Sequence, residues 1–216
     1  SAKENDVFLM EAMWARFVPG TKKLLEIVES GSLGKIRGIQ STFSYDMSDE
    51  PDHHAFDPKY GGGSILDVGC YCLSFASWYA NSEPEQITAV AELSDKGVDL
   101  HCCYLIKYKN GAIASLSSGM TLRKPNEGYL FGEKGYAYVE RSYAPQKIEL
   151  HIEGKDVEVI DCPYYGNGFE EQIMEASECL RQGKKESDIM THDQSRLIMR
   201  LMDEIRRQVG VKYPVD

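Results

Sequence analysis

Seven short runs of β-forming residues follow one another between residues 86 and 161, and they constrain the fold more than any other feature. Asn110-Gly111, Lys134-Gly135 and Gly154-Lys155 lie between runs, and pairs of this kind adopt the backbone of tight hairpin turns. This spacing predicts an antiparallel meander. The predicted strands are 86–93, 98–108, 112–120, 129–132, 136–140, 147–152 and 157–161.

Helical patterns flank these strands. Pro19 opens the first helix, Thr191 and Gln194 form a capping box at the start of the last, and Gly210 ends it. A separate strand is expected over 35–45. The predicted helices are 21–30, 64–80, 169–182 and 191–209. Together these elements predict an α+β fold, with an open, mostly antiparallel sheet and flanking helices.

Two further segments complete the outline. The apolar run 7–17 (VFLMEAMWARF) is typical of a buried strand, and the polar stretch 46–60 is typical of a surface loop.

The net charge of −10 argues against a broad nucleic-acid or anionic-membrane surface. No segment approaches the ~18 apolar residues of a membrane span. The six cysteines form no CxxC pair, so we interpret them as reduced thiols of a cytoplasmic protein.

The helix expected over 64–80 carries the strongest candidate site. It follows three glycines, 61–63, which allow close approach to a ligand or act as a hinge. Asp67 and Tyr71 are four residues apart, so on a helix they share one face. An acid beside a phenol can orient a substrate hydroxyl and move its proton. The plainer alternatives are that Ser64 and Asp67 form a capping box, and that Tyr71 is a core tyrosine.

Weaker candidates lie in loops and strands. His53 and His54 have no obvious third ligand, so we expect no metal site and place these residues at the rim of a pocket. Arg16 and Arg37 lie in or beside apolar strands, where each either pairs with an acid or anchors a substrate or cofactor group. The aromatic, turn-rich stretch 164–169 is either a pocket rim or a plain loop. No strand is followed by a Gly-x-Gly-x-x-Gly dinucleotide motif.

Four segments also carry a family resemblance: EAMWARFVPG (11–20), GSLGKIRGIQ (31–40), GGGSILDVGCYCLSFASWY (61–79) and MRLMDEIRRQVGVKYP (199–214). With them, nearly the whole chain resembles the C-terminal portion of the glucose-fructose oxidoreductase / inositol dehydrogenase / MocA (GFO/IDH/MocA) family of NAD(P)-dependent dehydrogenases. EAMWARF and DVGCY look most similar to the branch of dimeric dihydrodiol dehydrogenases and D-xylose dehydrogenases. Relatives that reduce biliverdin or anhydrosugars share this architecture and stay open as alternatives.

The resemblance implies an N-terminal Rossmann domain that binds NAD or NADP, and a second domain that binds substrate and forms oligomers. We therefore expect residues 1–18 to be a trailing Rossmann strand and 19–216 to be the substrate-binding and oligomerisation domain. The family's Glu-Lys-Pro lysine is absent from this sequence, so the chain alone should be inactive.

The resemblance also assigns roles to residues. Tyr71 would be the acid/base at a CH–OH group of a sugar, polyol or cyclic diol, with Asp67 orienting. The other expected contacts are Arg37, His53, Tyr165 and Asn167 for substrate, and Glu11 and Arg16 for cofactor. The rival interpretation is a non-catalytic assembly or ligand-binding module. Under either, we expect a homodimer or higher homo-oligomer through the sheet, motivated by apolar positions such as Ile113 and Leu116.

Overall fold

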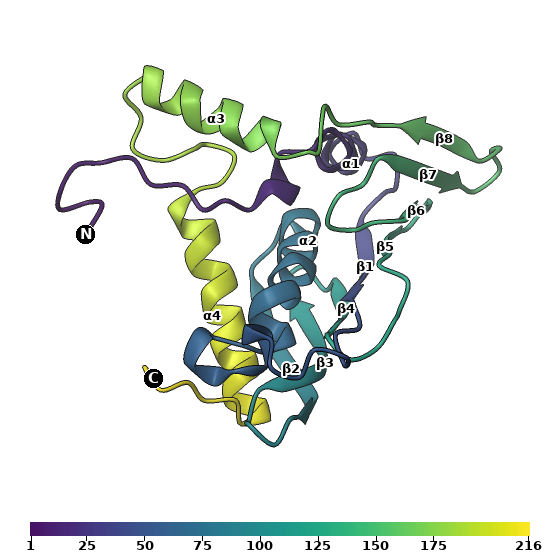
Figure 1. The fold of residues 1–216 in the computed structure, drawn as a ribbon. Coiled ribbons are helices and arrows are strands. Elements are labelled where there is room, and N and C mark those ends of the chain that lie inside the picture. The colour runs from purple at the N-terminus through teal and green to yellow at the C-terminus, as the bar shows by residue number, and fades with distance from the viewer.

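The computed structural model describes residues 1–216, and its elements follow the predicted order closely (Figure 1). The helices are α1 (Pro19–Glu29), α2 (Cys70–Ala80), α3 (Glu170–Arg181) and α4 (His192–Val209). The strands are β1 (Ile36–Ser44), β2 (Pro84–Leu93), β3 (Asp99–Tyr108), β4 (Ile113–Gly119), β5 (Gly128–Gly132), β6 (Gly135–Val139), β7 (Lys147–Ile152) and β8 (Glu158–Asp161). The predicted capping box of α4 and its end at Gly210 are confirmed.

All eight strands form one sheet in the order β2-β3-β4-β1-β5-β6-β7-β8. Every neighbouring pair is antiparallel except β1 and β4, which run parallel. The α+β class with a mostly antiparallel sheet is therefore confirmed. The prediction of a single continuous meander is wrong, because β1 lies between β4 and β5 in the sheet. The chain leaves β1 through α2 before it enters β2, and a crossover of this kind can return a strand parallel to β1.

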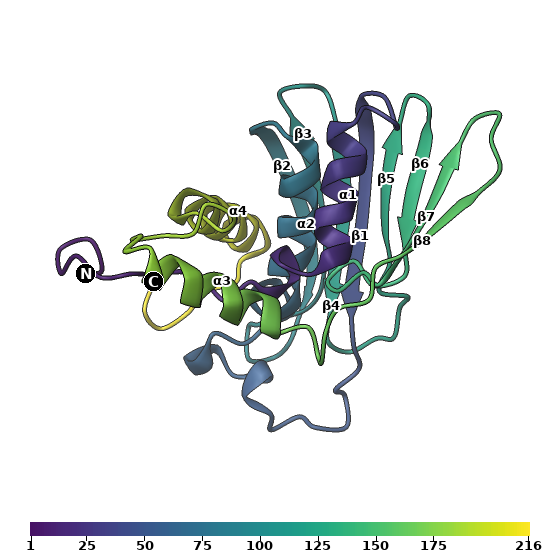
Figure 2. The same cartoon turned by 90° about the horizontal axis from the view of Figure 1, so that it is seen from above.

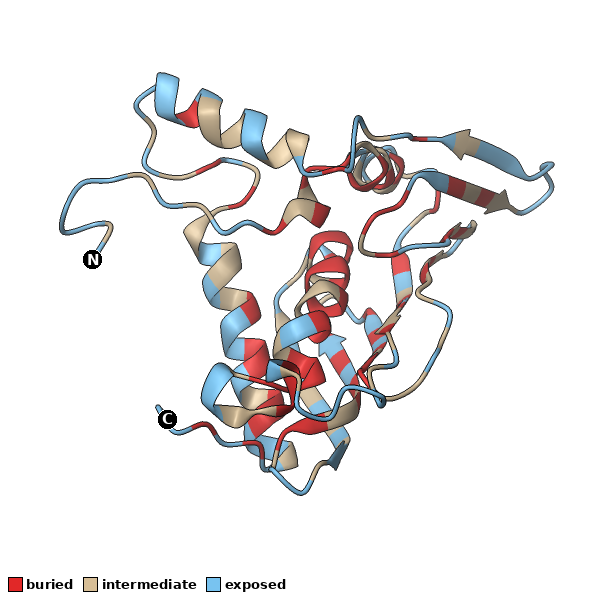
Figure 3. Cartoon of the chain, in the orientation of Figure 1, coloured by how far each residue is buried: buried red, intermediate tan, exposed pale blue.

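Helices α1, α2 and α4 cover one face of the sheet, whereas no helix covers the other (Figure 2). Buried residues gather between these helices and the sheet, in a core of 34 residues (Figure 3). Helix α2 packs on β1 and β4, and α4 packs on β2. Because α2 is apolar on nearly all sides, it runs through the middle of this core, with eight of its eleven residues buried.

The uncovered surface, which we call the open face, carries alternate residues of the central strands. They include Thr42, Val90, Cys103, Leu105, Ser117 and Tyr129. Ile113 also points outward and is 52% exposed, whereas Leu116 is buried against the helices. The expectation that Ile113 and Leu116 share the uncovered face is therefore wrong for Leu116, because residues three apart in a strand point to opposite faces.

The predicted strand over 7–17 is also wrong. None of the eight strands lies beside it, and an isolated strand cannot satisfy its backbone hydrogen bonds. The segment is irregular and ends in a 3₁₀ turn over Trp14–Arg16, with Met13, Ala15 and Phe17 anchored in the core. The division into domains at residue 18 stays a prediction. None of the helices combines the length and the apolar character needed to cross a bilayer.

Candidate active site

The helix that carries the candidate site begins with an irregular turn. Residues Ile65–Gly69 form a π-helical turn, which is wider than an α-turn and is frequent at functional sites, and α2 continues from it. Asp99 at the start of β3 holds this turn. Its Oδ2 accepts hydrogen bonds from Ser64 Oγ (2.6 Å) and from the backbone N–H of Ile65 (2.9 Å). The capping-box interpretation is therefore wrong, because the Ser64 hydroxyl donates to Asp99 and makes no capping hydrogen bond. Asp67 is thus free to bind another partner.

The three glycines before this turn approach the protein's own chain closely. A side chain on Gly62 would overlap the Ala55 carbonyl, and one on Gly63, whose φ is +114°, would overlap the Asp99 carboxylate. The Tyr213 hydroxyl near the C-terminus also donates to the Gly62 carbonyl oxygen at 2.7 Å. The glycines therefore let the loop pack tightly beneath the helix, which positions Asp67 and Tyr71.

Asp67 is exposed, and its Oδ2 accepts a hydrogen bond from the hydroxyl of Tyr45. Tyr45 directly follows β1, so the sheet holds it opposite the π-helical turn. Burial, together with the Asp67 carboxylate, raises the pKa of Tyr45, which keeps this phenol protonated as a donor. No local pattern pointed to Tyr45, because its contact with Asp67 joins residues 22 positions apart.

Tyr71 is half-buried, so it is accessible rather than sealed in the core. The indole Nε1–H of Trp14 donates a hydrogen bond to its hydroxyl oxygen at 3.2 Å. Burial raises the pKa of Tyr71, and the nearby Cys70 and Asp67 raise it further, whereas the bond from Trp14 opposes them. Tyr71 is therefore a neutral phenol near pH 7, and it needs a nearby cation before it can give up its proton readily.

Aromatic rings lie beside the ring of Tyr71. Phe43 lies edge-on to the Tyr71 ring at 5.4 Å and stacks on Tyr143 at 4.1 Å. Trp14 continues the wall to Phe169 (4.9 Å) and Tyr164 (6.3 Å), both in the aromatic stretch before α3. We call Trp14, Phe43, Tyr143, Tyr164 and Phe169 the aromatic wall. Its members come from four separate segments, so only that last stretch was recognisable in the sequence.

The structure does not bring the other expected substrate residues to Tyr71. Arg37 lies at the opposite end of β1 from Phe43, and its Nε donates to Glu133 at 3.0 Å. The His53 ring accepts a hydrogen bond from the backbone of Ala55. Tyr165 is 81% exposed. Asn167 caps its own loop through the N–H of Phe169. Substrate contacts by these four residues stay predictions.

The two expected cofactor residues, Glu11 and Arg16, have different neighbours. Glu11 is exposed and lies close enough to Cys70 to raise the pKa of that thiol. Arg16 donates to the Ile189 carbonyl and lies over the Trp78 ring at 4.9 Å, so its guanidinium already has partners. The N-terminus of the glycine-led helix is filled by the Asp99 carboxylate, which would repel a phosphate. The N-terminus of this helix therefore does not offer a site for the phosphates of a dinucleotide. Cofactor contacts by Glu11 and Arg16 stay predictions.

Comparison with known proteins identifies the family. Residues 21–138 match the family model described as the GFO/IDH/MocA C-terminal domain. The chain belongs to the GFO/IDH/MocA family. It is similar to trans-1,2-dihydrobenzene-1,2-diol dehydrogenase from mouse, at 33% identity over 227 residues that cover all of this chain, and to the human protein, at 30% over 222 residues. The chain spans 66% of the length of each of these relatives.

Solved structures share the fold of this chain. An aldose-aldose oxidoreductase from Caulobacter crescentus, complexed with glycerol, superimposes with a TM-score of 0.86 at 22% identity, over 96% of this chain and 63% of that one. A 3-ketoreductase from Actinomadura kijaniata, in complex with NADP and TDP-benzene, gives a TM-score of 0.82 at 20% identity, over 96% and 64%. At these identities the likeness establishes the fold.

Proposed function

We propose that this chain is the substrate-binding part of an NAD(P)-dependent oxidoreductase that acts on a CH–OH group of a sugar, polyol or cyclic diol. The observation that carries the proposal is the half-buried Tyr71, set one helical turn from Asp67, with Trp14 hydrogen-bonded to its hydroxyl and Phe43 edge-on to its ring. Flat rings favour a cyclic substrate over a linear one, because a ring buries more apolar surface against them. The names of the dihydrodiol dehydrogenase relatives agree with this preference.

In this proposal Tyr71 receives the proton of the substrate hydroxyl during oxidation, and returns it during reduction. The hydrogen bond from Trp14 occupies one side of the Tyr71 oxygen, which leaves the other side for the substrate. Asp67, steadied by Tyr45, accepts a hydrogen bond from a second substrate hydroxyl. No Lys or Arg side chain donates to Tyr71, so we propose that the required cation comes from the part of the protein that the longer relatives also have.

The same reasoning assigns NAD or NADP to that additional part, because the helix N-terminus here is filled by Asp99. The nicotinamide would accept or supply the hydride, while this chain binds and orients the substrate and moves its proton. We accordingly expect the chain on its own to be inactive, as predicted from the sequence.

Tyr71→Phe in the full-length protein tests the proposal. Hydride transfer would be followed by nicotinamide absorbance, with cyclic diols, pyranoses and linear polyols as substrates. We expect kcat to fall about 10²- to 10⁴-fold with the best substrate, because general acid–base help is lost. Tyr60→Phe, on a tyrosine that is 73% exposed, is the matched control. Unchanged rates in Tyr71→Phe would remove the catalytic assignment.

The second candidate is an assembly module, and the open face favours it. Val90, Leu105 and Ile113 are each more than half exposed there, and Tyr129 stacks parallel to Phe131 at 5.5 Å. We propose that two copies pair through this face. Pairing is compatible with the oxidoreductase proposal, because Tyr71 lies on the helix side of the sheet.

A further inference from the structure

A very short element carries the hydrogen bond from Trp14 to Tyr71. Trp14 lies in the 3₁₀ turn Trp14–Arg16, which is three residues long and has no side-chain cap at its start. Isolated turns of this length are unstable, because they fix several backbone angles for very few hydrogen bonds. The Tyr71 hydroxyl nevertheless has this indole N–H as its partner. Contacts from the rest of the molecule must therefore set the position of Trp14.

Thr21 of α1 holds the middle of the turn. Its hydroxyl donates to the Ala15 carbonyl oxygen at 2.6 Å, and both residues are only 1% exposed. The carbonyl oxygen of Thr21 accepts in turn from the hydroxyl of Tyr79, on α2, at 3.2 Å. Loss of the Thr21 hydroxyl would leave the Ala15 carbonyl unpaired in the core. Thr21 therefore fixes the residue next to Trp14 relative to α2.

Arg16 holds the end of the turn. Its Nε donates to the Ile189 carbonyl oxygen at 3.2 Å, and its guanidinium lies over the Trp78 ring at 4.9 Å. Trp78 and Tyr79 lie near the C-terminal end of α2, whereas Tyr71 lies at its start. One helix thus carries Tyr71 and also supports the turn whose indole reaches Tyr71.

The aromatic wall also contacts Trp14, but it does not fix the direction of the indole N–H. The rings of Phe169, Tyr143 and Tyr164 lie tilted or edge-on to Trp14 at 4.9, 6.3 and 6.3 Å. Contacts between rings are favourable over centroid distances of about 4.5 to 7 Å, whereas a hydrogen bond weakens steeply when its angle changes. Small movements of the indole that the wall tolerates would therefore break its bond to Tyr71.

We propose that Thr21 and Arg16, which we call the turn clamp, are positioning residues that hold Trp14 with its indole N–H on the Tyr71 hydroxyl oxygen. The consequence for catalysis rests on the proposed function, in which the substrate approaches the side of this oxygen that Trp14 leaves free. A displaced indole would let the Tyr71 hydroxyl turn away from the substrate. It would also remove the contact that opposes the rise in the pKa of Tyr71.

Thr21 acts on Tyr71 through Trp14 and not through charge. Because Thr21 is uncharged, Thr21→Val leaves every titratable group around Tyr71 in place. Two of these groups lie on the same helical segment as Tyr71, one ring faces it from the segment between β6 and β7, and two groups adjoin the first pair. They are Asp67, Cys70, Tyr143, Tyr45 and Glu11. A change in the pKa of Tyr71 in Thr21→Val therefore reports a movement of Trp14.

Thr21→Val tests the turn clamp on this chain, without cofactor or substrate. The two tryptophans give two indole N–H signals in a proton–nitrogen NMR spectrum, and Trp14→Phe assigns them. We expect the Trp14 indole proton to exchange with solvent about tenfold faster, because it loses its acceptor on Tyr71. Arg16→Met should speed the same exchange, since its side chain cannot donate to the Ile189 carbonyl.

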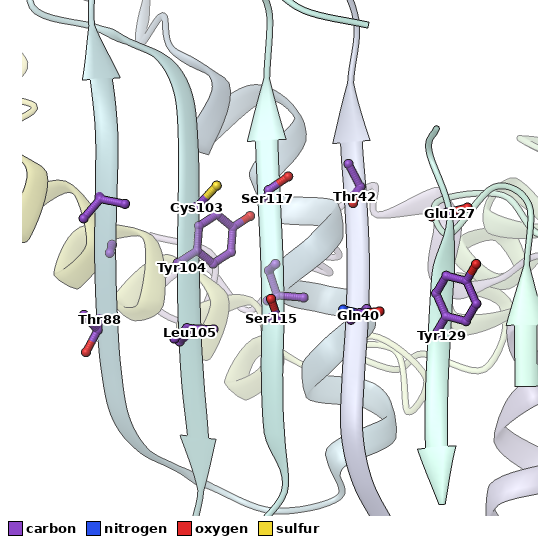
Figure 4. Close-up of a pocket in the computed structure, with 13 residues that line it drawn as sticks. Gln40, Thr42, Thr88, Cys103, Tyr104, Leu105, Ser115, Ser117, Glu127 and Tyr129 are labelled. Carbon is purple, nitrogen blue, oxygen red and sulfur yellow. The ribbon is translucent and has the colours of Figure 1, made fainter. Parts of the chain in front are cut away.

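Two further variants separate the turn clamp from general destabilisation. Thr21→Ser keeps the hydroxyl and should return the exchange rate to that of the parent. Thr88→Val is the matched control, because Thr88 is exposed on β2 and faces the open side of the sheet (Figure 4). It should leave the exchange unchanged. Circular dichroism would verify that each variant is folded.

In the full-length protein, Thr21→Val should lower kcat about three- to tenfold and change KM less. The limb of the pH–rate profile that reports Tyr71 should move to higher pH, and Thr21→Ser should restore it. Indole exchange at the parent rate in either folded clamp variant would overturn the proposal, as would an unmoved pH–rate profile while Tyr71→Phe is inactive. Faster exchange, combined with full activity of Tyr71→Phe, would confirm the turn clamp and remove the proposed function instead.

Discussion

At the scale of single residues, two tyrosines near the Asp67 carboxylate make different hydrogen bonds. Tyr45 donates to Asp67, while the Tyr71 hydroxyl accepts from Trp14 and stays free of Asp67. If Tyr45 were absent, the carboxylate could turn toward Tyr71, where its negative charge would raise the pKa of that phenol further. Tyr45 is therefore a positioning residue in the proposed mechanism.

Tyr45→Phe in the full-length protein should lower kcat roughly tenfold, because Asp67 loses its partner. The limb of the pH–rate profile that reports the ionisation of Tyr71 should also move to higher pH, since the pKa of Tyr71 rises. Steady-state rates measured across a pH series would show both effects. A profile that keeps its shape while Asp67→Asn inactivates the enzyme would contradict the positioning role.

At the scale of elements, the glycine-led helix depends on a partner from another strand. Asp99 is fully buried, and its Oδ1 has no hydrogen-bond partner while Oδ2 holds Ser64 and Ile65. Burial raises the pKa of Asp99 to about 6. The stability that this carboxyl contributes in its neutral form is therefore fully present below about pH 4, and it is lost as the pH rises through about 6.

Asp99→Asn should remove this pH dependence. Relative to the variant, the parent chain should lose on the order of 3 kcal/mol of unfolding free energy between about pH 4 and pH 7. Urea denaturation at several pH values measures the difference. If the unfolding free energies of the two proteins changed with pH in parallel, ionisation of the buried Asp99 would not destabilise the fold, and the prediction would be wrong.

Gly63→Ala tests the packing beneath the helix. The added Cβ would overlap the Asp99 carboxylate at a φ of +114°, so we expect a loss of about 2–4 kcal/mol of stability. Gly154→Ala, at a hairpin end with φ +74° and open space around it, carries only the backbone strain and should cost about 1 kcal/mol. Thermal or urea unfolding would rank the two, and equal losses would refute the packing argument.

At the scale of the whole molecule, the sheet separates two surfaces. Helix α2, which carries Tyr71, lies on one side of the sheet, and no helix covers the other side (Figure 2). The open face on that other side carries the exposed apolar residues Val90, Leu105 and Ile113. Exposed apolar patches of this kind mark surfaces that another molecule covers. A second copy can therefore pair through the open face without covering Tyr71.

Leu105→Glu should weaken self-association at least about tenfold, because it places a charge on the open face, where Leu105 is 51% exposed. Ile173→Glu, on α3 and 60% exposed, is the matched control and should leave association unchanged. Sedimentation equilibrium measures both. A parent chain that stays monomeric at high concentration would rule out pairing through this face.

Local patterns in the sequence determined the eight strands of the sheet, the helices, the α4 capping box and the family, because each depends on residues only a few positions apart. The same patterns wrongly predicted a strand over 7–17. The approximate place of the candidate site was readable in the same way from Asp67 and Tyr71. Tertiary structure alone decided that β1 lies between β4 and β5, that Asp99 holds the start of the helix, and that Trp14 reaches Tyr71. These contacts join segments tens of residues apart, and they exist only once the packed core has brought the segments together.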